Sequence, residues 1–208
     1  MNSLLVLTWF FIQVVTNQFN QNNEFQEEHQ IITDCNFTFE EATDGLEIPS
    51  SIIKQLVLVD VEYYSFDEKL HKGQIVINKK ASKEIKAIFE FIKEARFPIA
   101  KVVPIAKYKW RDEESMNDNN TASFNYRKVE GTKILSAHSY GMAIDINPLQ
   151  NPHIKGKVVQ PPSAKYDPKA KGTILRDSKL VNEFVKRGWQ WGGRWRSSQD
   201  YQHFEKKN

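Results

Sequence analysis

The sequence predicts an α+β fold, a small mixed domain in which strands and helices follow one another without regular βαβ alternation. Its 208 residues suit one domain of ordinary size. Residues 56–64, LVLVDVEYY, are β-branched and aromatic and favour a strand. Residues 82–95 carry apolar side chains at helical spacing and favour a helix.

The same patterns predict the remaining elements in chain order. A second strand is expected at about 74–78. The helix at 82–95 has Ser82 as a candidate N-cap, and its apolar face consists of Ile85, Ile88, Phe89 and Ile92. Further along, we expect a buried strand at 97–106, a polar surface loop at 111–127, an irregular stretch at 150–172 and a helix at 178–187 that stops at Gly188.

The N-terminus has the pattern expected of a targeting signal. Residues 4–15, LLVLTWFFIQVV, are almost wholly apolar, and residues 1–16 contain no charged side chain. This run is too short to span a bilayer as a helix but matches the core of a signal peptide. We therefore predict a signal peptide at 1–16 and export, with a buried strand or helix as the alternative. A polar linker or arm at 17–47 then precedes a single domain at 48–208.

Composition limits the classes of partner and site. Lys and Arg number 29 against 26 Asp and Glu, so the net charge of +3 argues against nucleic-acid binding by bulk charge. A polyanion such as cell wall could still interact with a mildly basic surface. The single cysteine, Cys35, excludes an intramolecular disulfide and a cysteine-based zinc finger. A metal site must therefore use His, Asp and Glu.

The first segment whose residues could form a reactive site is SAHSYGMAIDINP, residues 136–148. On a strand, Met142, Ile144 and Ile146 face the core, and Asp145 projects from the opposite face. His138 lies just before this strand, after a turn that Gly141 permits. An acid on a strand and a histidine one turn earlier can converge on a cation.

The second segment is WGGRWRSSQDYQHFE, residues 191–205. Alternation places His203 and Glu205 on one face of a strand. Asp200 reaches the same site only if a turn or bulge ends there. Two histidines and one carboxylate are a common catalytic zinc set. Zinc lowers the pKa of bound water from about 15.7 to about 7, and a nearby carboxylate can accept the proton.

Together, SxHxxGxAxD and the Trp-Gly-Gly-x-Trp…Asp-x-x-His-Phe block resemble the M15 zinc peptidases of bacterial cell-wall metabolism. The resemblance covers about residues 98–206 and implies a Hedgehog/DD-peptidase-like fold whose antiparallel sheet carries the zinc site. It implies one Zn²⁺ per chain, held by His138, Asp145 and His203. It also implies that Asp200 is the general base, that Arg127 binds substrate or stabilises developing charge, and that Ser136 and Tyr140 line the pocket.

Each assignment has a structural alternative. Asp200 could be a turn cap with Glu205 as the true base, although we interpret Glu205 as a partner of a zinc-bound histidine or a surface acid. Arg127 suits an oxyanion or carboxylate because its planar fork is permanently charged, and its competitors are Arg111, Arg194 and Arg196. Trp191 and Trp195 are expected to pack under the site. The remaining histidines, His29, His71 and His153, receive no functional role.

The predicted function is an exported zinc metallopeptidase, in the periplasm or cell envelope, that hydrolyses a peptide bond in the peptidoglycan stem peptide. The two motifs look VanY-like and favour a D-alanyl-D-alanine carboxypeptidase. One alternative is an L-alanyl-D-glutamate endopeptidase with the same site, and another is a non-catalytic, zinc-containing cell-wall-binding module. The expected partners are stem peptides, with no nucleic acid and no stable membrane span after leader removal.

Overall fold

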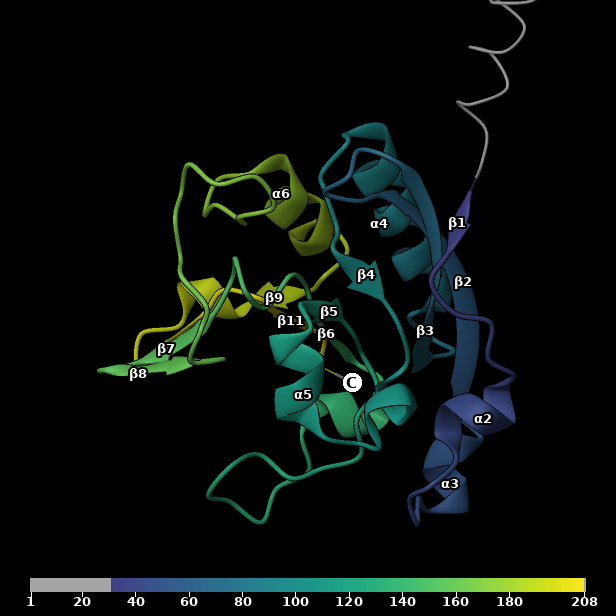
Figure 1. The fold of residues 1–208 in the computed structure, drawn as a ribbon. Coiled ribbons are helices and arrows are strands. Elements are labelled where there is room, and N and C mark those ends of the chain that lie inside the picture. The colour runs from purple at the N-terminus through teal and green to yellow at the C-terminus, as the bar shows by residue number, and fades with distance from the viewer. Residues whose placement is uncertain (1–30, 208) are drawn as a thin grey trace, which may run out of the picture. The chain divides into compact units, whose positions relative to one another are not determined.

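A computed structural model describes residues 31–207, and Figure 1 shows its elements. The chain divides into two units, residues 1–32 and 33–208, and the second is described below. The signal peptide expected at 1–16 and the first part of the arm expected at 17–47 lie outside the described residues. Among residues 31–207, no helix is both long enough and apolar enough to cross a membrane.

The described chain mixes helices with several small, mainly antiparallel sheets, which confirms the mixed class expected from the sequence. The strand orders are β1-β3-β2, β10-β7-β8 and β6-β11-β9, with a separate β4-β5 pair. Strands β4 and β5 pair in parallel, whereas β2-β3, β7-β8, β10-β7, β6-β11 and β11-β9 pair antiparallel.

A long antiparallel hairpin forms the first sheet. Its strands are β2 (Leu56–Tyr64) and β3 (Leu70–Asn78), and the short β1 (Ile32–Thr33) precedes them in the chain. The strand expected at 56–64 is confirmed. The strand expected at 74–78 begins earlier, at Leu70, because β2 pairs with it along its whole length, from Leu56 opposite Asn78 to Tyr64 opposite Leu70.

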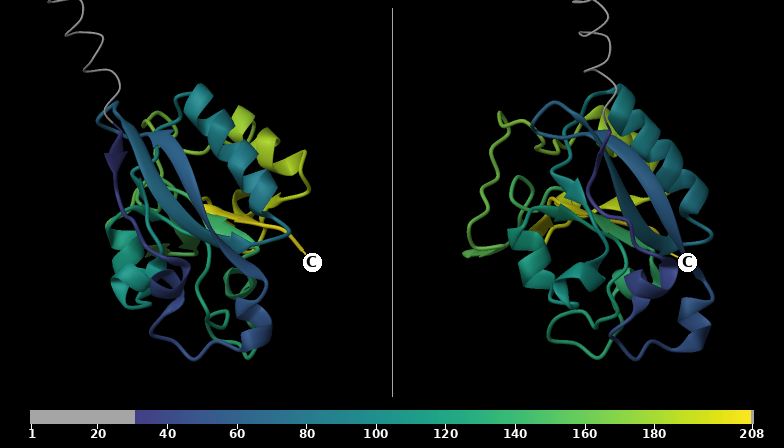
Figure 2. Two further views of the ribbon diagram at one scale, coloured as in Figure 1. Left: turned by 90° about the vertical axis from the view of Figure 1, so that its right-hand side faces the viewer. Right: turned by 45° about the vertical axis from the view of Figure 1, so that its right-hand side comes forward.

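Helix α4 (Ser82–Glu94) covers this hairpin, and α6 (Lys179–Val185) packs beside α4 (Figure 2). The helix expected at 82–95 is therefore confirmed. The expected N-cap is wrong, because Ala81 occupies that position and the Ser82 hydroxyl donates to the Lys79 carbonyl instead. The apolar face is buried as expected, with at most 1% exposure for Ile85, Ile88, Phe89 and Ile92.

The segment at 97–106 is buried but is not the continuous strand that we expected. It holds only β4 (Lys101–Val102), followed by the 3₁₀ helix η1 (Ile105–Tyr108). Pro98 and Pro104 flank β4 in the sequence. Proline has no N–H to donate, so it interrupts a strand on both sides.

The expectation of a surface loop at 111–127 is wrong. The segment forms α5 (Asp112–Asn117) and β5 (Asn120–Thr121), and residues 120–125 are all buried. Asn120 shows why a polar segment can enter the interior. Its side chain accepts from the Val103 N–H at 2.9 Å and donates to the Val103 carbonyl at 2.8 Å, so both polar ends are satisfied.

Two other polar stretches also contain regular structure. Within the expected arm, α2 (Phe39–Thr43) begins with a capping box between Thr38 and Glu41. Helix α3 (Ser50–Ile53) follows shortly after the end of the arm. Within the expected irregular stretch at 150–172, β7 and β8 form a hairpin. These strands are His153–Lys155 and Val158–Gln160.

The sheet that matters most for function is β6-β11-β9. Its strands are β6 (Ala143–Asp145), β9 (Gln190–Trp191) and β11 (His203–Glu205), and both pairings are antiparallel. Ile144 and Phe204 are register partners and are fully buried in the main core. The alternation of strand residues therefore turns the neighbouring pair, Asp145 and His203, toward the opposite face.

Candidate metal centre

His138 is held in the 3₁₀ helix η2 (Ala137–Tyr140) directly before β6. The Ser136 hydroxyl accepts from the His138 N–H at 3.3 Å and caps the start of the turn. Gly141 ends it with φ of 61°, and a Cβ there would lie 2.6 Å from the Asn78 nitrogen. Glycine is therefore required by both conformation and space. The result is a buried His138, with 4% exposure.

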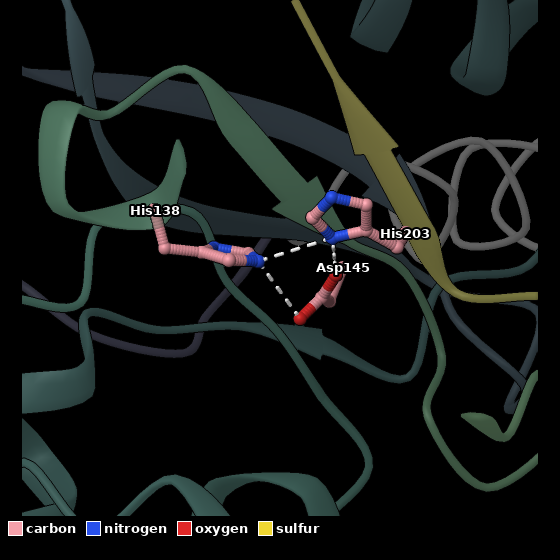
Figure 3. Close-up of side chains that lie close together, drawn as sticks. All are labelled: His138, Asp145 and His203. Atoms are coloured by element: carbon pink, nitrogen blue, oxygen red, sulfur yellow. Dashed lines mark hydrogen bonds and ion pairs between the residues drawn. The ribbon is translucent and has the colours of Figure 1, made fainter. Parts of the chain in front are cut away.

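His138, Asp145 and His203 converge on one point (Figure 3). One carboxylate oxygen of Asp145 lies 2.9 Å from His203 Nδ1, and the other lies 3.2 Å from His138 Nε2. The two ring nitrogens are 3.2 Å apart. The three ligand atoms thus lie within 4.8 Å of one another, on a turn and two paired strands.

The outer nitrogens of both rings face acceptors. His138 Nδ1 lies 2.5 Å from the Ser123 carbonyl oxygen, and His203 Nε2 lies 3.4 Å from Glu205 Oε2. A neutral imidazole carries one N–H and one lone pair. These partners therefore place the N–H groups outward and direct both lone pairs toward Asp145.

This donor set fits a metal cation. Two nitrogen lone pairs and a carboxylate face one another at hydrogen-bonding distances, yet none of the three supplies a proton when both histidines are neutral. Either a proton or a metal cation among these atoms relieves the mutual repulsion of three such acceptors. Nitrogen and carboxylate ligands with outward N–H partners are also how proteins build zinc sites.

The titration of the cluster agrees with this need for positive charge. Burial raises the pKa of the Asp145 carboxyl, but the charges and hydrogen bonds of His138 and His203 outweigh burial and hold the pKa well below its usual range. Burial lowers the pKa of His203, but hydrogen bonds with Asp145 and Glu205 raise it to about 10. The acidic groups around His203 therefore favour positive charge at this position.

Asp200 lies beside this cluster. It ends β10 (Gln199–Asp200), and a bend at residues 201–202 leads into β11. A Cβ built on Gly192 would lie 2.9 Å from the Asp200 Cβ and 3.4 Å from the His203 Cβ, so both side chains leave the backbone beside the same glycine. The structure thus contains the bend that the sequence could only assume.

The Asp200 carboxyl has one buried oxygen, Oδ1, without a hydrogen-bond partner in the described part of the chain. Burial raises the pKa of this carboxyl, and the like charge of Asp145 raises it further. The charges of the three histidines, His203, His153 and His138, lower the pKa but do not cancel the effect of burial. A carboxylate with a raised pKa is a stronger base, which favours accepting a proton.

Comparison with known proteins identifies this region. Residues 130–206 match the family model described as D-alanyl-D-alanine carboxypeptidase, one of the M15 peptidases. All three converging side chains and Asp200 lie inside the matched segment, and M15 peptidases are metal-dependent. No curated protein and no solved structure matches the chain.

The M15 resemblance also predicts a role for Arg127, which lies just before the matched segment. Its backbone is tied to the η2 turn, because its N–H donates to the Ser139 hydroxyl at 2.9 Å and its carbonyl accepts from the Ser136 N–H at 3.0 Å. The guanidinium Nε lies 2.9 Å from Asp112 Oδ2, an ion pair without hydrogen-bond geometry. Its role toward substrate stays a prediction.

The predicted pocket residues of the candidate metal centre have clear structural contacts. Ser136 caps the turn of His138, and Tyr140 is half-buried against the hydrophobic core. Trp191 is buried and donates to the Tyr201 carbonyl at 2.8 Å, while the Trp195 ring lies 5.3 Å from the His203 ring. Trp195 therefore lies against the second histidine, whereas Trp191 packs on Tyr201 and Phe204.

Sequence reasoning missed two neighbours of the candidate metal centre. The Ser123 carbonyl orients His138, but every residue has a carbonyl, so no side chain could have signalled it. His153 was given no role, yet it is the register partner of Asp200 between β7 and β10. Its signal would have been the alternating pattern of a hairpin around the Gly156 turn.

Proposed function

We propose that the protein is an exported zinc metallopeptidase that hydrolyses a peptide bond in the peptidoglycan stem peptide, as a D-alanyl-D-alanine carboxypeptidase. The observation that carries the proposal is the convergence of His138, Asp145 and His203 within the matched M15 segment. Export is supported by the apolar, uncharged run near the N-terminus. The antiparallel sheet holding Asp145 and His203 supports a Hedgehog/DD-peptidase-like fold.

We assign the metal ligands to His138, Asp145 and His203 because their lone pairs converge. Zinc is the proposed ion because two histidines and one carboxylate leave a fourth position open in a tetrahedral site. A bound zinc ion supplies Lewis acidity toward a carbonyl oxygen and makes water a nucleophile near neutral pH.

Asp200 is the proposed general base. Its unpartnered oxygen is beside the ligands, and its raised pKa favours accepting a proton from the attacking water. The same carboxyl can return this proton to the leaving amine. Arg127 is the proposed anchor for substrate charge, because its guanidinium is permanently cationic and its backbone is fixed to the turn that carries His138.

The carboxypeptidase assignment is supported by the description of the matched family. Its test uses the purified chain from about Asn17, assayed for metal and incubated with a defined pentapeptide stem and with intact muropeptides. We expect loss of one alanine mass, abolished by a chelator and restored by zinc. Cleavage between the first alanine and the glutamate would indicate the endopeptidase instead. Stoichiometric zinc without cleavage of either substrate would contradict the hydrolase proposal.

Asp200→Ala separates an enzyme from a non-catalytic binding module. An enzyme should lose hydrolysis by about 100-fold or more while retaining its zinc, because general base catalysis contributes roughly that much. Asp177→Ala is the matched control, since Asp177 is exposed. Unchanged behaviour of both variants would favour the binding module.

A further inference from the structure

A second feature adjoins the candidate metal centre, the face of the β10-β7-β8 sheet. Strand β7 is central, and His153 pairs with Asp200 on one side and with Gln160 on the other. Register partners in an antiparallel sheet project from the same face. Asp200, His153 and Gln160 therefore form a row of polar side chains that starts at the proposed base and leads away from it.

The next row on the same face contains a free cation. Lys155 pairs with Val158 two residues further along the hairpin, so it shares the face of His153. Both Lys155 and Val158 are exposed, Val158 at 58%. Among the described residues, Lys155 takes part in no ion pair.

The charge of this hairpin has one sign. Residues 151–162, NPHIKGKVVQPP, contain Lys155 and Lys157 and no Asp or Glu. Figure 1 shows β7 and β8 extending outward at one side of the ribbon, away from α2, α3 and α4. An unpaired cation on a projecting sheet face attracts anions, and no carboxylate of the hairpin itself competes for it.

Because this sheet face is continuous with Asp200 and carries an unpaired positive charge, we infer that the β10-β7-β8 face binds the acyl side of an acidic peptide substrate. Lys155 and His153 then select a carboxylate on that peptide. The inference rests on the proposed function for the position of the scissile bond next to Asp200. His153 adjoins Asp200 and contacts the part of the peptide nearest the reaction. Lys155 lies one row further out and pairs with a side-chain carboxylate of a more distant residue.

The hairpin provides its own control. Lys157 has the same charge and exposure as Lys155 but lies in the turn between β7 and β8, outside the paired rows. General attraction of anions depends on both lysines equally. Recognition by the sheet face depends on Lys155 alone.

The experiment uses two synthetic peptides that differ only in whether one side chain on the acyl side is a free carboxylate or its amide. The unsubstituted protein should cleave the acid with the lower KM. Lys155→Gln should raise KM for the acid about two- to fivefold, as expected for one exposed ion pair, and leave kcat and the amide unchanged. Lys157→Gln should preserve the preference, and His153→Gln should weaken binding of both peptides.

Equilibrium binding separates this inference from the proposed chemistry. Calorimetric titration of both peptides into the Asp200→Ala protein, with and without Lys155→Gln, measures recognition without turnover. Tighter binding of the acid that Lys155→Gln abolishes supports the inference, even if the unsubstituted protein cleaves neither peptide and the hydrolase proposal fails. Equal affinity for acid and amide, or equal losses in the Lys155→Gln and Lys157→Gln proteins, would overturn it.

Discussion

Asp145 and His203 face each other across β6 and β11, with 2.9 Å between the carboxylate Oδ1 and the ring Nδ1. They are 58 residues apart in the chain, and the strand pairing alone brings them together. Their register neighbours, Ile144 and Phe204, are fully buried. The same alternation that anchors the sheet in the core therefore presents two candidate ligand groups on a rigid support.

Removing Asp145 should remove the metal. Asp145→Ala takes away the only carboxylate of the converging set, so we expect metal affinity to fall by more than the roughly 100-fold that loss of an outer partner can cost. Metal content after dialysis, with Asp177→Ala as the control, measures this. Retention of stoichiometric metal by the Asp145 variant would exclude the proposed ligand set.

Glu205 should tune the centre through His203. Its Oε2 lies 3.4 Å from His203 Nε2 and fixes the ring orientation. Glu205→Leu should lower metal affinity about 10- to 100-fold by removing the acceptor. Glu205→Gln, which keeps an acceptor oxygen, should lose less. Competition with a chelator of known affinity measures both, and equal affinities in the two variants would show that Glu205 does not act as an acceptor.

Gly192 should be needed for the position of Asp200. A Cβ at Gly192 would lie 2.7 Å from the Asp200 carbonyl oxygen, so Gly192→Ala must shift the backbone. We expect a loss of about 1–3 kcal/mol in unfolding free energy, with activity falling more than metal content. Gly131→Ala is the control, because its φ of 73° strains alanine but its Cβ meets nothing within 4 Å. Matching activity losses in both variants would contradict a local effect at Asp200.

His71 should make stability depend on pH. Its Nδ1 lies 2.8 Å from Asp34 Oδ1 and its Nε2 lies 3.2 Å from Asp67 Oδ2, while the Tyr63 hydroxyl also bonds Asp34. Burial lowers the pKa of His71, but hydrogen bonds to the two carboxylates raise it above the ordinary 6.5.

Because the folded-state pKa is the higher one, the protonated His71 stabilises the fold fully below about pH 6.5 and loses this effect as the pH rises through the folded-state pKa. Denaturant unfolding of the unsubstituted and His71→Gln proteins, measured across this range, should give a stability difference that shrinks with rising pH. A constant difference would rule out the ion pairs as its source.

The local patterns identified much of the fold and the site. Alternation around Asp145 and His203 predicted their strands and faces, because a strand with one buried side must alternate. The helix at 82–95 followed from the spacing of its apolar residues. These features depend on neighbours in the chain, so they can be read from the sequence.

Other features depended on partners distant in the chain. Residues 111–127 look solvent-exposed by composition, yet the Asn120 side chain forms buried hydrogen bonds with the Val103 backbone. In the same segment, the backbone carbonyl of Ser123 orients the His138 ring. Composition does not reveal where a polar group finds its partner.

The sequence by itself determined the ligand types, the two motifs and the strands that carry them. The tertiary structure alone decided that a bend beside Gly192 turns Asp200 toward His203, and that β7 places His153 next to Asp200. The physical reason is that alternation fixes which way a side chain points along one strand. Only packing and register between strands fix which side chains meet.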